Sequence, residues 1–387
     1  MIQSNKSKRA LVCSPLIPEF DRESGSRRLF HLVEFLLQDG WHVSYVAENP
    51  NMDRKYVESF EQMGVSVYGG FHTRTDQLIE FGEFDLAILA FWYIAERLIP
   101  KIRVSSPSTK ILVDSIDLHF LRNSRMILNG GDGSNYLLDE NYANEMTREL
   151  NAYSLADGVL TVSEKEARMV NDMINRPGFA HAVQDYEELA ASSLSFYERR
   201  GIYFIGNFRH TPNIDAAKFL CEEIYPLLDR ELLERDPIYI IGNAPQDEIL
   251  DMVEKLPNVH ITGWVPSVIP YIENAKITLL PLRFGAGTKR KFIQALMVGT
   301  PSISTDIGAE GLGLIPETHF ILANTATEFA ESIKSLTNNE SKWNKVASAG
   351  REHIVKYQSQ SYAMKKFKSI LDSFLAKSIS TSEILSE

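Results

Sequence analysis

The chain has 387 residues, of which 44% are hydrophobic and 24% charged, and its formal net charge is −11. This length exceeds one typical hydrophobic core and predicts two domains. The acidic balance argues against a nucleic-acid partner, which would demand a basic face, and favours at most peripheral membrane contact.

Cysteine usage and hydrophobic runs predict a cytoplasmic protein. Cys13 and Cys221 lie far apart in apolar segments, which is typical of reduced core thiols and not of a disulfide framework or a metal cluster. No apolar run approaches the ~20 residues of a membrane span. The N-terminal stretch MIQSNKSKR also lacks the apolar region of a signal peptide.

In the first half of the chain, short β-rich runs alternate with helical patterns. Strands are predicted at 10–14, 43–47, 65–68, 85–91, 110–116 and 159–163, with helices at 26–37 and 54–63. Such alternation is typical of βαβ crossovers and a parallel sheet. The runs 9–13 and 85–90 have no polar phase, which favours strands covered on both faces. The stretch 129–135 is interpreted as a mobile, turn-rich loop and not as a metal loop.

The periodicity weakens around 176–178, and a second alternating series follows. Its predicted strands are 202–206, 238–242, 259–262, 277–282 and 302–305, and its predicted helices are 214–228, 246–253 and a succession from 328 to about 375. We therefore predict an α/β protein with two doubly wound domains. The expected boundaries are an N-terminal domain at 1–195, a C-terminal domain at 196–358 and a C-terminal helix at 359–387 that could pack back on the N-terminal domain.

The stretch 283–312 predicts an anion pocket. An apolar strand runs into a Gly-rich turn with Lys289, Arg290 and Lys291, and a helix follows. Glycines let backbone N–H groups approach a ligand, the helix N-terminus adds partial positive charge, and lysines neutralise a phosphate. The turn lacks the third glycine of a dinucleotide fingerprint, and the chain contains no GxxxxGK[ST] motif. The alternative is an ordinary strand-to-helix turn with solvated lysines.

A second strand-to-helix turn in the same half is Gly206 to Asn213. Gly206 permits close backbone approach, and Arg209 could bind phosphate as a bidentate fork. Two such turns at the carboxyl edge of one sheet would build a single pocket. The alternative is a plain helix start capped by Thr211 or Asn213, with proline near the first position.

Several segments resemble the signatures of family 4 (group 1) retaining glycosyltransferases. They are GNFRHTPNIDA, GAGTKRKFIQALMVGTPSISTDIGAEGL and ADGVLTVSEKE. In the N-terminal half, PEFDRESGSRRLFHLVEFLLQDGWHV and DSIDLHFLRNSR resemble a branch of that family found in surface polysaccharide and O-antigen biosynthesis. The resemblance covers about 11–314 and implies the GT-B fold, in which two Rossmann-like domains face a cleft.

The resemblance also implies a reaction and its partners. Such enzymes move a sugar, with retention of configuration, from a nucleoside diphosphate donor to an acceptor. The donor is a substrate, and no cofactor and no required metal are expected. The implied acceptor is a saccharide, a lipid-linked glycan or another glycoconjugate.

Residue by residue, the resemblance assigns the donor site to the C-terminal half. The diphosphate would be held by Gly206, Arg209, Lys289 and Lys291, within turns that also contain Asn207, Gly285, Gly287 and Thr288. Family members usually carry two glutamates eight residues apart, where this chain has Ala286 and Gln294. Gln294 takes the ribose-binding position, and an amide is a weaker acceptor than a carboxylate. Glu310 is implied to touch sugar or ribose hydroxyls, and the alternative is a solvated acid in a loop.

In the N-terminal half, the resemblance implies a catalytic role for His119, with Asp117 beside it at a strand end. Gly25, Ser26 and Arg27 are implied to contact the acceptor or to approach the donor on closure. The alternatives are a structural histidine and, less favoured, a metal site of Asp114, Asp117 and His119, because no second cluster would complete the coordination.

Two other functions remain open from the sequence. A nucleotide-sugar epimerase of the same fold would need acid and base side chains around the sugar in place of an acceptor groove. A non-catalytic nucleotide-sugar-binding subunit is compatible with Ala286 and Gln294.

Overall fold

The computed structural model describes residues 8–70, 73–128 and 139–384, so the loop expected at 129–135 lies outside the described residues. The chain divides into two compact units. Unit 1 comprises Met1–Phe120, Glu140–Gln184 and Ala363–Glu387, and unit 2 comprises Leu121–Asp139 and Asp185–Tyr362.

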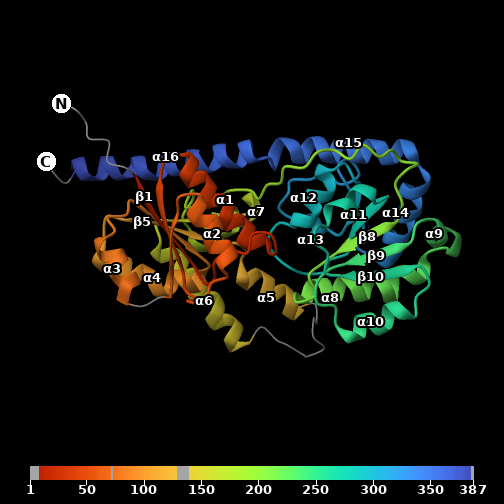
Figure 1. Ribbon diagram of the computed structural model, residues 1–387, viewed down its shortest axis with the longest axis horizontal. Helices are drawn as coiled ribbons and strands as arrows, with labels where there is room; N and C mark the ends of the chain where they lie inside the picture. Colours follow the sequence, from red (N-terminus) through yellow and green to blue (C-terminus); the bar gives the residue numbers. More distant parts are fainter. Residues whose placement is uncertain (1–7, 71–72, 129–138, 385–387) are drawn as a thin grey trace. The chain divides into compact units, whose positions relative to one another are not determined.

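Unit 1 is built on a seven-stranded parallel sheet in the order β3-β2-β1-β4-β5-β6-β7. The strands are β1 (Arg9–Ser14), β2 (His42–Ala47), β3 (Ser66–Gly69), β4 (Leu86–Ala90), β5 (Lys110–Asp114), β6 (Gly158–Thr161) and β7 (Ala180–Ala182). Helices cover both faces of this sheet (Figure 1). The central strands β1 and β4 are therefore almost wholly buried, as their lack of a polar phase predicts.

The following helices lie between the strands of unit 1 in the chain or follow unit 2 at the C-terminus. They are α1 (Ser24–Gln38), α2 (Arg54–Gln62), α3 (Thr73–Phe81), α4 (Trp92–Ser105), α5 (His119–Leu128), α6 (Glu140–Leu155), α7 (Glu164–Ile174) and α16 (Gln360–Ile384). Residues of α5 from Leu121 onward belong to unit 2. From Ala363 onward α16 belongs to unit 1, where Phe367 packs on Phe35 with ring centroids 6.0 Å apart.

Unit 2 contains a six-stranded parallel sheet in the order β10-β9-β8-β11-β12-β13. The strands are β8 (Ile202–Ile205), β9 (Ile238–Ile241), β10 (Val259–Gly263), β11 (Ile277–Leu280), β12 (Ser302–Ser304) and β13 (Ile321–Leu322). The helices are α8 (Thr211–Lys218), α9 (Arg230–Arg235), α10 (Asp247–Glu254), α11 (Ile269–Asn274), α12 (Arg290–Met297), α13 (Asp306–Ala309), α14 (Ala326–Asn338) and α15 (Glu340–Tyr357). The predicted α/β class is confirmed. In each unit the order of the strands across the sheet is that of a Rossmann-like sheet, with one additional strand in unit 1.

Two of the differences from the predicted spans have local backbone reasons. The strand expected at 110–116 ends at Asp114, because the chain turns at Ile116, whose φ is +63°. The helix expected at 214–228 is divided into α8, a π-helical segment at Phe219–Ile224 and a 3₁₀ turn at Tyr225–Leu227. Pro226 has no amide hydrogen with which to continue the α-helical pattern.

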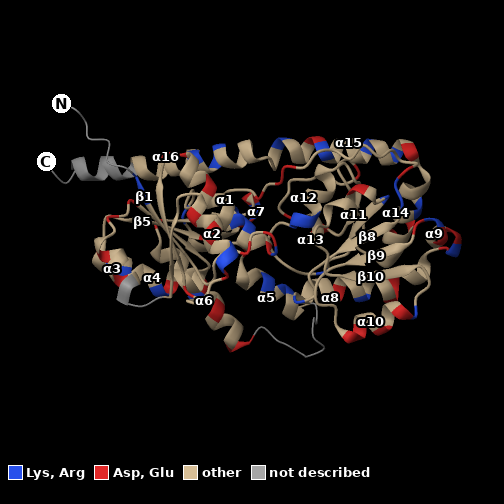
Figure 2. Ribbon diagram, viewed as in Figure 1, with Lys and Arg blue, Asp and Glu red and all other residues tan. Residues whose placement is uncertain are grey.

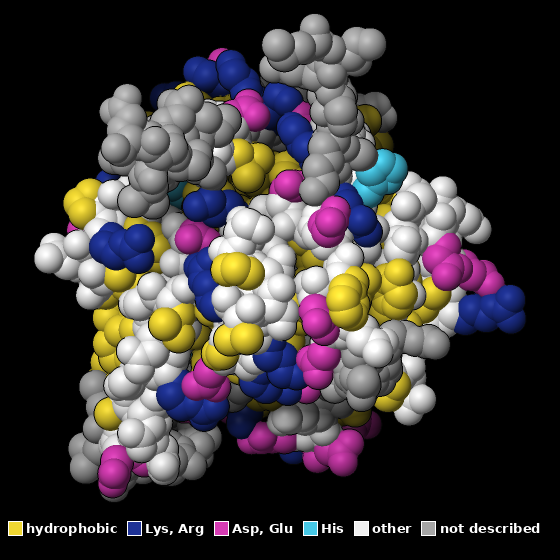
Figure 3. Space-filling model, turned by 90° about the vertical axis from the view of Figure 1, so that its left-hand side faces the viewer, with side chains coloured by type: hydrophobic (Ala, Val, Ile, Leu, Met, Phe, Trp, Pro, Cys, Tyr) yellow, Lys and Arg dark blue, Asp and Glu magenta, His cyan; other side chains and the backbone are white. Residues whose placement is uncertain are grey.

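The cysteines and the surface agree with the composition. Cys13 and Cys221 are free and buried, as expected, and burial raises the pKa of Cys221 to about 12. No helix in the described part of the chain is long and apolar enough to span a membrane. On the face drawn in Figure 3, the described basic and acidic side chains are interspersed and form no continuous basic field.

A buried ion pair fixes the start of α1 against β5 in unit 1. The Arg28 guanidinium and the Asp114 carboxylate are 3% and 0% exposed. Nε and Nη2 of Arg28 donate to Oδ1 of Asp114 at 2.9 and 2.8 Å, and Nη1 donates to the carbonyl of Val183 at 2.6 Å. Asp114 is thus engaged by an arginine, which argues against the metal-ligand alternative for this residue.

We expect Asp114→Asn to lower the free energy of unfolding by about 3 kcal/mol, because it leaves the buried Arg28 charge without a counterion. The matched control is Glu58→Gln, which breaks the exposed pair with Arg54 and should cost less than about 0.5 kcal/mol. Urea unfolding of the three proteins measures both values. Equal stability of the two variants would contradict the structural role of the buried pair.

Candidate functional site

The two Gly-rich turns of unit 2 meet at the point where its strand order reverses. Strands β8 and β11 are hydrogen-bonded neighbours, and the turns 206–210 and 281–289 follow their carboxyl ends. Ligands of doubly wound sheets bind at such switch points. Pro212 lies 4.0 Å from the position that a Cβ on Gly285 would take, so the turns are in contact range. The structure therefore brings together the two turns that the sequence predicts to form one pocket.

Lys291 joins the two turns. Its ammonium group donates to the carbonyl oxygen of Ile205 at 2.5 Å and to Oδ1 of Asn213 at 2.6 Å, and it lies 4.9 Å from the Phe204 ring centroid. Among the described residues it meets no carboxylate. Burial, and to a lesser extent the nearby Lys289 charge, lower the pKa of Lys291 to about 7. An ammonium has three donors, so one remains for a ligand oxygen.

The Gly-rich turn is held by contacts to its own backbone. Lys289 donates to the carbonyl oxygens of Ala286 at 3.0 Å and Gly287 at 2.5 Å. Gly285 and Gly287 have φ values of +135° and +69°, which favour glycine at both positions. Ala286 is half-buried between them. In Figure 2 the beginning of the following helix α12 is marked by basic residues.

Both helices that start at the pocket lack a side-chain cap. The N-cap residues are His210 for α8 and Lys289 for α12, and neither makes a capping hydrogen bond. The alternative that Thr211 or Asn213 caps α8 is therefore wrong. Asn213 instead donates to the carbonyl of Asn207 at 2.9 Å and accepts from Lys291. First-turn N–H groups at two helix starts are thus free of side-chain caps, which suits an anion.

Gly206 is fixed by tight packing in the turn after β8, whereas Arg209 is exposed. A Cβ on Gly206 would lie 2.9 Å from Asn213 atoms, so the residue must be small for the turn to close. Asn207 accepts from the backbone N–H of Arg209 at 3.1 Å and shapes the turn. The Arg209 side chain is exposed, where an incoming anion can reach it. Its phosphate-binding role stays a prediction.

Gln294 has a partner that sequence reasoning missed. Its amide nitrogen lies 3.4 Å from Oε1 of Glu187, which also accepts from Nε of Arg290. Glu187 and Gln294 are 4% and 6% exposed. Glu187 belongs to the irregular segment between β7 and β8, where no motif or periodicity marks it. Its neighbour Asp185 accepts from Thr288 at 2.8 Å.

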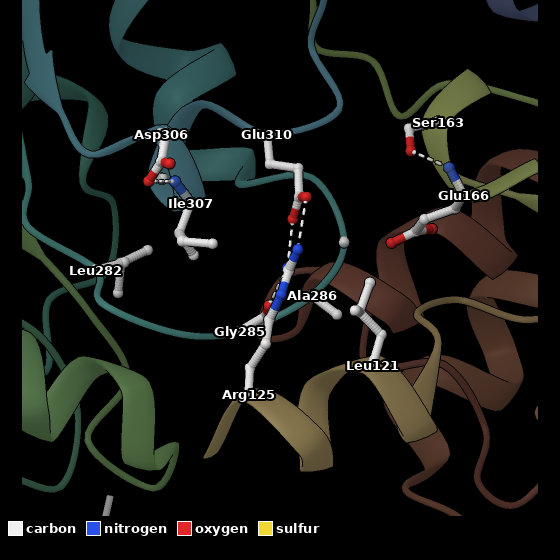
Figure 4. A network of polar contacts seen from close by, with 12 residues as sticks. Leu121, Arg125, Ser163, Glu166, Leu282, Gly285, Ala286, Asp306, Ile307 and Glu310 are labelled. Carbon is white, nitrogen blue, oxygen red and sulfur yellow. Dashed lines mark hydrogen bonds and ion pairs between the residues drawn. The ribbon is translucent and has the colours of Figure 1, made fainter. Parts of the chain in front are cut away.

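Glu310 is engaged by an arginine. Nη1 and Nη2 of Arg125 donate to its carboxylate at 2.5 and 2.8 Å, and Nη1 also donates to the carbonyl of Gly285 at 2.7 Å (Figure 4). This bidentate arrangement is a strong type of charge-assisted contact. It links the loop after α13 to the Gly-rich turn within unit 2. Sequence spacing gives no sign of it, because Arg125 and Glu310 are far apart in the chain.

In unit 1, His119 stands at the start of α5 within a group of aromatic side chains. Nε1 of Trp92 donates to its Nδ1 at 3.1 Å, and its Nε2 is 3.3 Å from Oδ1 of Asp117. The neutral ring would therefore carry its proton on Nε2. The rings of Phe91 and Tyr93 lie 5.7 and 6.1 Å from the imidazole.

A buried carboxylate fixes the backbone at this histidine. Oε1 and Oε2 of Glu149 accept the backbone N–H groups of His119 and Phe120 at 3.0 and 2.8 Å, and Tyr153 donates to Oε1. Burial raises the pKa of Glu149. The carboxylate caps α5 at its positive end. The sequence predicted the neighbourhood of Asp117 and His119 but missed Trp92 and Glu149.

Gly25, Ser26 and Arg27 lie in the first turn of α1 and not in a loop before it. The expectation of a helix starting at Ser26 was therefore two residues late. A Cβ on Gly25 would lie 2.9 Å from Cγ2 of Ile116, so tight packing alone explains the glycine. Nε of Arg27 is buried without a hydrogen-bond partner among the described residues.

The described residues contain no group of three or more His, Cys, Asp or Glu side chains that could hold a metal ion. For Asp114, Asp117 and His119 the reason is plain, because Asp114 is turned to Arg28.

Comparison with solved structures establishes the fold class. Sucrose-phosphate synthase from Thermosynechococcus elongatus superposes with a TM-score of 0.72 at 14% identity, over 96% of this chain and 100% of that one. TarM of S. aureus, solved with fondaparinux, alpha-GlcNAc-glycerol and UDP, gives 0.71 at 10% identity over 94% and 99%. HepE of Anabaena, solved with UDP, gives 0.69 at 12% identity over 95% and 100%. At these identities the likeness shows the fold, which is GT-B.

The family follows from the sequence of unit 2. Residues 199–339 match the family described as Glycosyl transferases group 1. This domain, which contains both Gly-rich turns, thus matches the group 1 glycosyltransferases. The expected group 1 resemblance is confirmed for this domain, whereas retention and the polysaccharide and O-antigen branch stay predictions. No match was found among curated proteins.

The depressed pKa of Lys291 makes a testable contribution to stability. In the unfolded chain the lysine binds a proton up to about pH 10.5, whereas in the folded protein it loses it near pH 7. Between these values the unfolded state binds more protons, so stability rises with pH. Lys291→Met removes this penalty, so its gain over wild type should be largest, up to a few kcal/mol, below pH 7 and should vanish near pH 10.5.

Urea unfolding at pH 6.5 and pH 9.5 measures the effect. The control is Lys345→Met, which alters an exposed lysine and should shift stability equally at both pH values. A Lys291→Met difference that does not change with pH would show that Lys291 is not desolvated.

Proposed function

We propose that the protein is a retaining glycosyltransferase that moves a sugar from a nucleoside diphosphate donor to a saccharide acceptor in surface polysaccharide or glycoconjugate synthesis. The observation that carries the proposal is the Lys291 ammonium, which lies at the switch point of unit 2 without a carboxylate counterion among the described residues. A partly desolvated cation of this kind is stabilised by an anionic ligand. The group 1 family match identifies the kind of chemistry.

The leaving diphosphate is the group that most needs stabilisation. Negative charge develops on it as the bond to the sugar breaks, and Lys289, Lys291 and the amides at the starts of α8 and α12 can face that charge. Arg209, being exposed, would close on the phosphates from the turn after β8. These groups supply the positive charge from the protein, so we propose that no metal is required.

Other parts of the proposal rest on the comparisons. The motifs at 206–216 and 285–312 resemble those of retaining enzymes, which supports retention. TarM and HepE were solved with UDP, which supports a nucleoside diphosphate donor. TarM was also solved with alpha-GlcNAc-glycerol, which supports a glycoconjugate acceptor. Two free, buried cysteines suit the reducing cytoplasm.

A panel of nucleotide sugars incubated with saccharide acceptors tests the whole proposal. We expect sugar transfer in which the anomeric configuration of the product, measured by proton NMR, matches that of the donor. We also expect the transfer activity to persist in EDTA. Epimerised donor without transfer would establish the epimerase alternative, and binding without any turnover would establish the non-catalytic one.

For the diphosphate pocket, we expect Lys291→Met and Arg209→Ala each to weaken binding of a nucleoside diphosphate by about 1.5 to 3 kcal/mol, because each loses a charge-assisted contact. The nucleoside alone should bind almost unchanged. Wild-type affinity should also fall as pH rises from 7 to 8.5, by up to tenfold per pH unit, since the bound state must take up a proton on Lys291. Calorimetric titration of both variants, with Lys345→Met as control, measures these affinities. If Lys291→Met and Arg209→Ala both bind the diphosphate as tightly as wild type, the diphosphate binds elsewhere.

For His119, we expect His119→Ala to fold, to keep its nucleotide affinity and to lose most transfer activity, because the contact matters mainly in the transition state. Steady-state rates beside calorimetric affinities separate the two effects. Trp92→Phe, which removes the donor to Nδ1 but leaves the imidazole in place, should lower the rate less. Full turnover of His119→Ala would exclude the histidine from the reaction.

A further inference from the structure

Glu187 connects an irregular segment of unit 2 to two consecutive turns of α12. Its Oε1 accepts from Nε of Arg290 and from Nε2 of Gln294, which are four residues apart and so lie on one face of the helix. The backbone N–H of Glu187 donates to the carbonyl of Gln358 at 3.3 Å. Two residues earlier, Asp185 holds Thr288. The segment 185–187 is thus fixed at two alternate positions, to the Gly-rich turn by Asp185 and to α12 by Glu187.

This contact determines which end of the Gln294 amide faces Glu187. A carboxylate only accepts hydrogen bonds when ionised, so the amide NH₂ must face it. The amide oxygen then points away from the carboxylate, and it accepts no hydrogen bond from the residues that the structure describes. Gln294 follows Lys291 by three residues on the same side of α12, next to the pocket of the proposed diphosphate.

The charges around Gln294 favour an amide over a carboxylate at this position. Glu187 is buried and carries one negative charge, which Arg290 neutralises. A second carboxylate at 294 would share the single guanidinium with Glu187 at close range, and like charges so placed destabilise each other. The residues at 187 and 294 are therefore coupled: a carboxylate at one suits an amide at the other.

We propose that Glu187 is a positioning residue of the donor site. By accepting from the amide NH₂, it presents the Gln294 oxygen to a bound nucleotide, where that oxygen accepts a hydrogen bond from a ribose hydroxyl. This inference rests on the proposed function. Without Glu187 the amide could offer either end, because its oxygen and nitrogen are alike in size.

The test compares a ribonucleoside diphosphate with its 2′,3′-dideoxy counterpart. Glu187→Gln keeps the shape of the side chain but can donate as well as accept, so it no longer dictates the amide orientation. For whichever of UDP, GDP and ADP binds wild type best, calorimetry should show that the preference over the dideoxy form falls about fivefold. The ratio is the readout, because losing the Glu187 charge strengthens the binding of every anion alike.

Glu188→Gln is the matched control, since it makes the same chemical change at an exposed neighbouring position and should leave the ratio unchanged. An unaltered ratio in Glu187→Gln, in a protein whose nucleotide binding still depends on Lys291, would overturn this inference alone. Absence of binding of every nucleotide and of inorganic pyrophosphate to wild type would instead overturn the proposed function.

A charge swap keeps the inference testable if Glu187→Gln is too unstable to titrate. Gln294→Glu alone should lower the midpoint of urea unfolding at pH 8, because two buried carboxylates then face each other. Adding Glu187→Gln to it should restore the midpoint, because one carboxylate again pairs with Arg290. A single variant Gln294→Glu as stable as wild type at pH 8 would show that the two side chains do not face each other.

Discussion

The reversal of strand order between β8 and β11 is the constraint on which unit 2 depends. Because these parallel strands are neighbours, the turns at their carboxyl ends must lie against each other, and the helices that follow must begin there. Within the turn after β8 the packing is so tight that Gly206 has no room for a Cβ beside Asn213. Lys291 crosses this point and hydrogen-bonds to both Ile205 and Asn213. Asn213 is consequently used to hold the lysine and not to cap its own helix.

Placing an ammonium there has a cost that the rest of the fold must offset. The fall of the Lys291 pKa to about 7 corresponds to a few kcal/mol of unfavourable free energy, from desolvation and from repulsion by Lys289. Another buried cation of unit 2, Arg199, is surrounded by four acceptors, namely the oxygens of Leu194, Ala275, Val298 and Thr300. Lys291 has two oxygen acceptors and a donor to spare. Arg199 therefore has a structural role, whereas Lys291 keeps one donor available for a ligand.

The sequence predicts the fold well because its signals are local. Uninterrupted apolar runs such as β4 and glycines with positive φ such as Gly287 report their own environment, so strands and turns could be placed within a few residues. Errors arise where a tertiary or backbone effect intervenes, as at Ile116 and Pro226. The same reasoning predicted that two turns would converge, since parallel strands end at a common edge.

The partners of the site residues could not be predicted, because they come from distant segments without motifs. Glu187 reaches Gln294 from the segment before β8, Arg125 reaches Glu310 from α5, and Glu149 reaches His119 from α6. Each pairing depends on side-chain direction in the folded protein and on burial, neither of which has a fixed sequence spacing. A local pattern can therefore nominate a functional residue but not say what orients it.

The neighbouring cations of the Gly-rich turn illustrate why that orientation matters. Arg290 and Lys291 are adjacent and would look equivalent as phosphate ligands. Arg290 forms an ion pair with the buried Glu187, so it is not available to a phosphate. This ion pair fixes segment 185–187 and, through Glu187, the Gln294 amide. Lys291 instead donates to the carbonyl oxygen of Ile205 and the amide oxygen of Asn213, and no carboxylate among the described residues neutralises it. Because its pKa is lowered to about 7, an anion that binds there also draws a proton onto the amine. Two adjacent residues of α12 therefore have different roles. Arg290 holds segment 185–187 in place, and Lys291 is available to bind an anion.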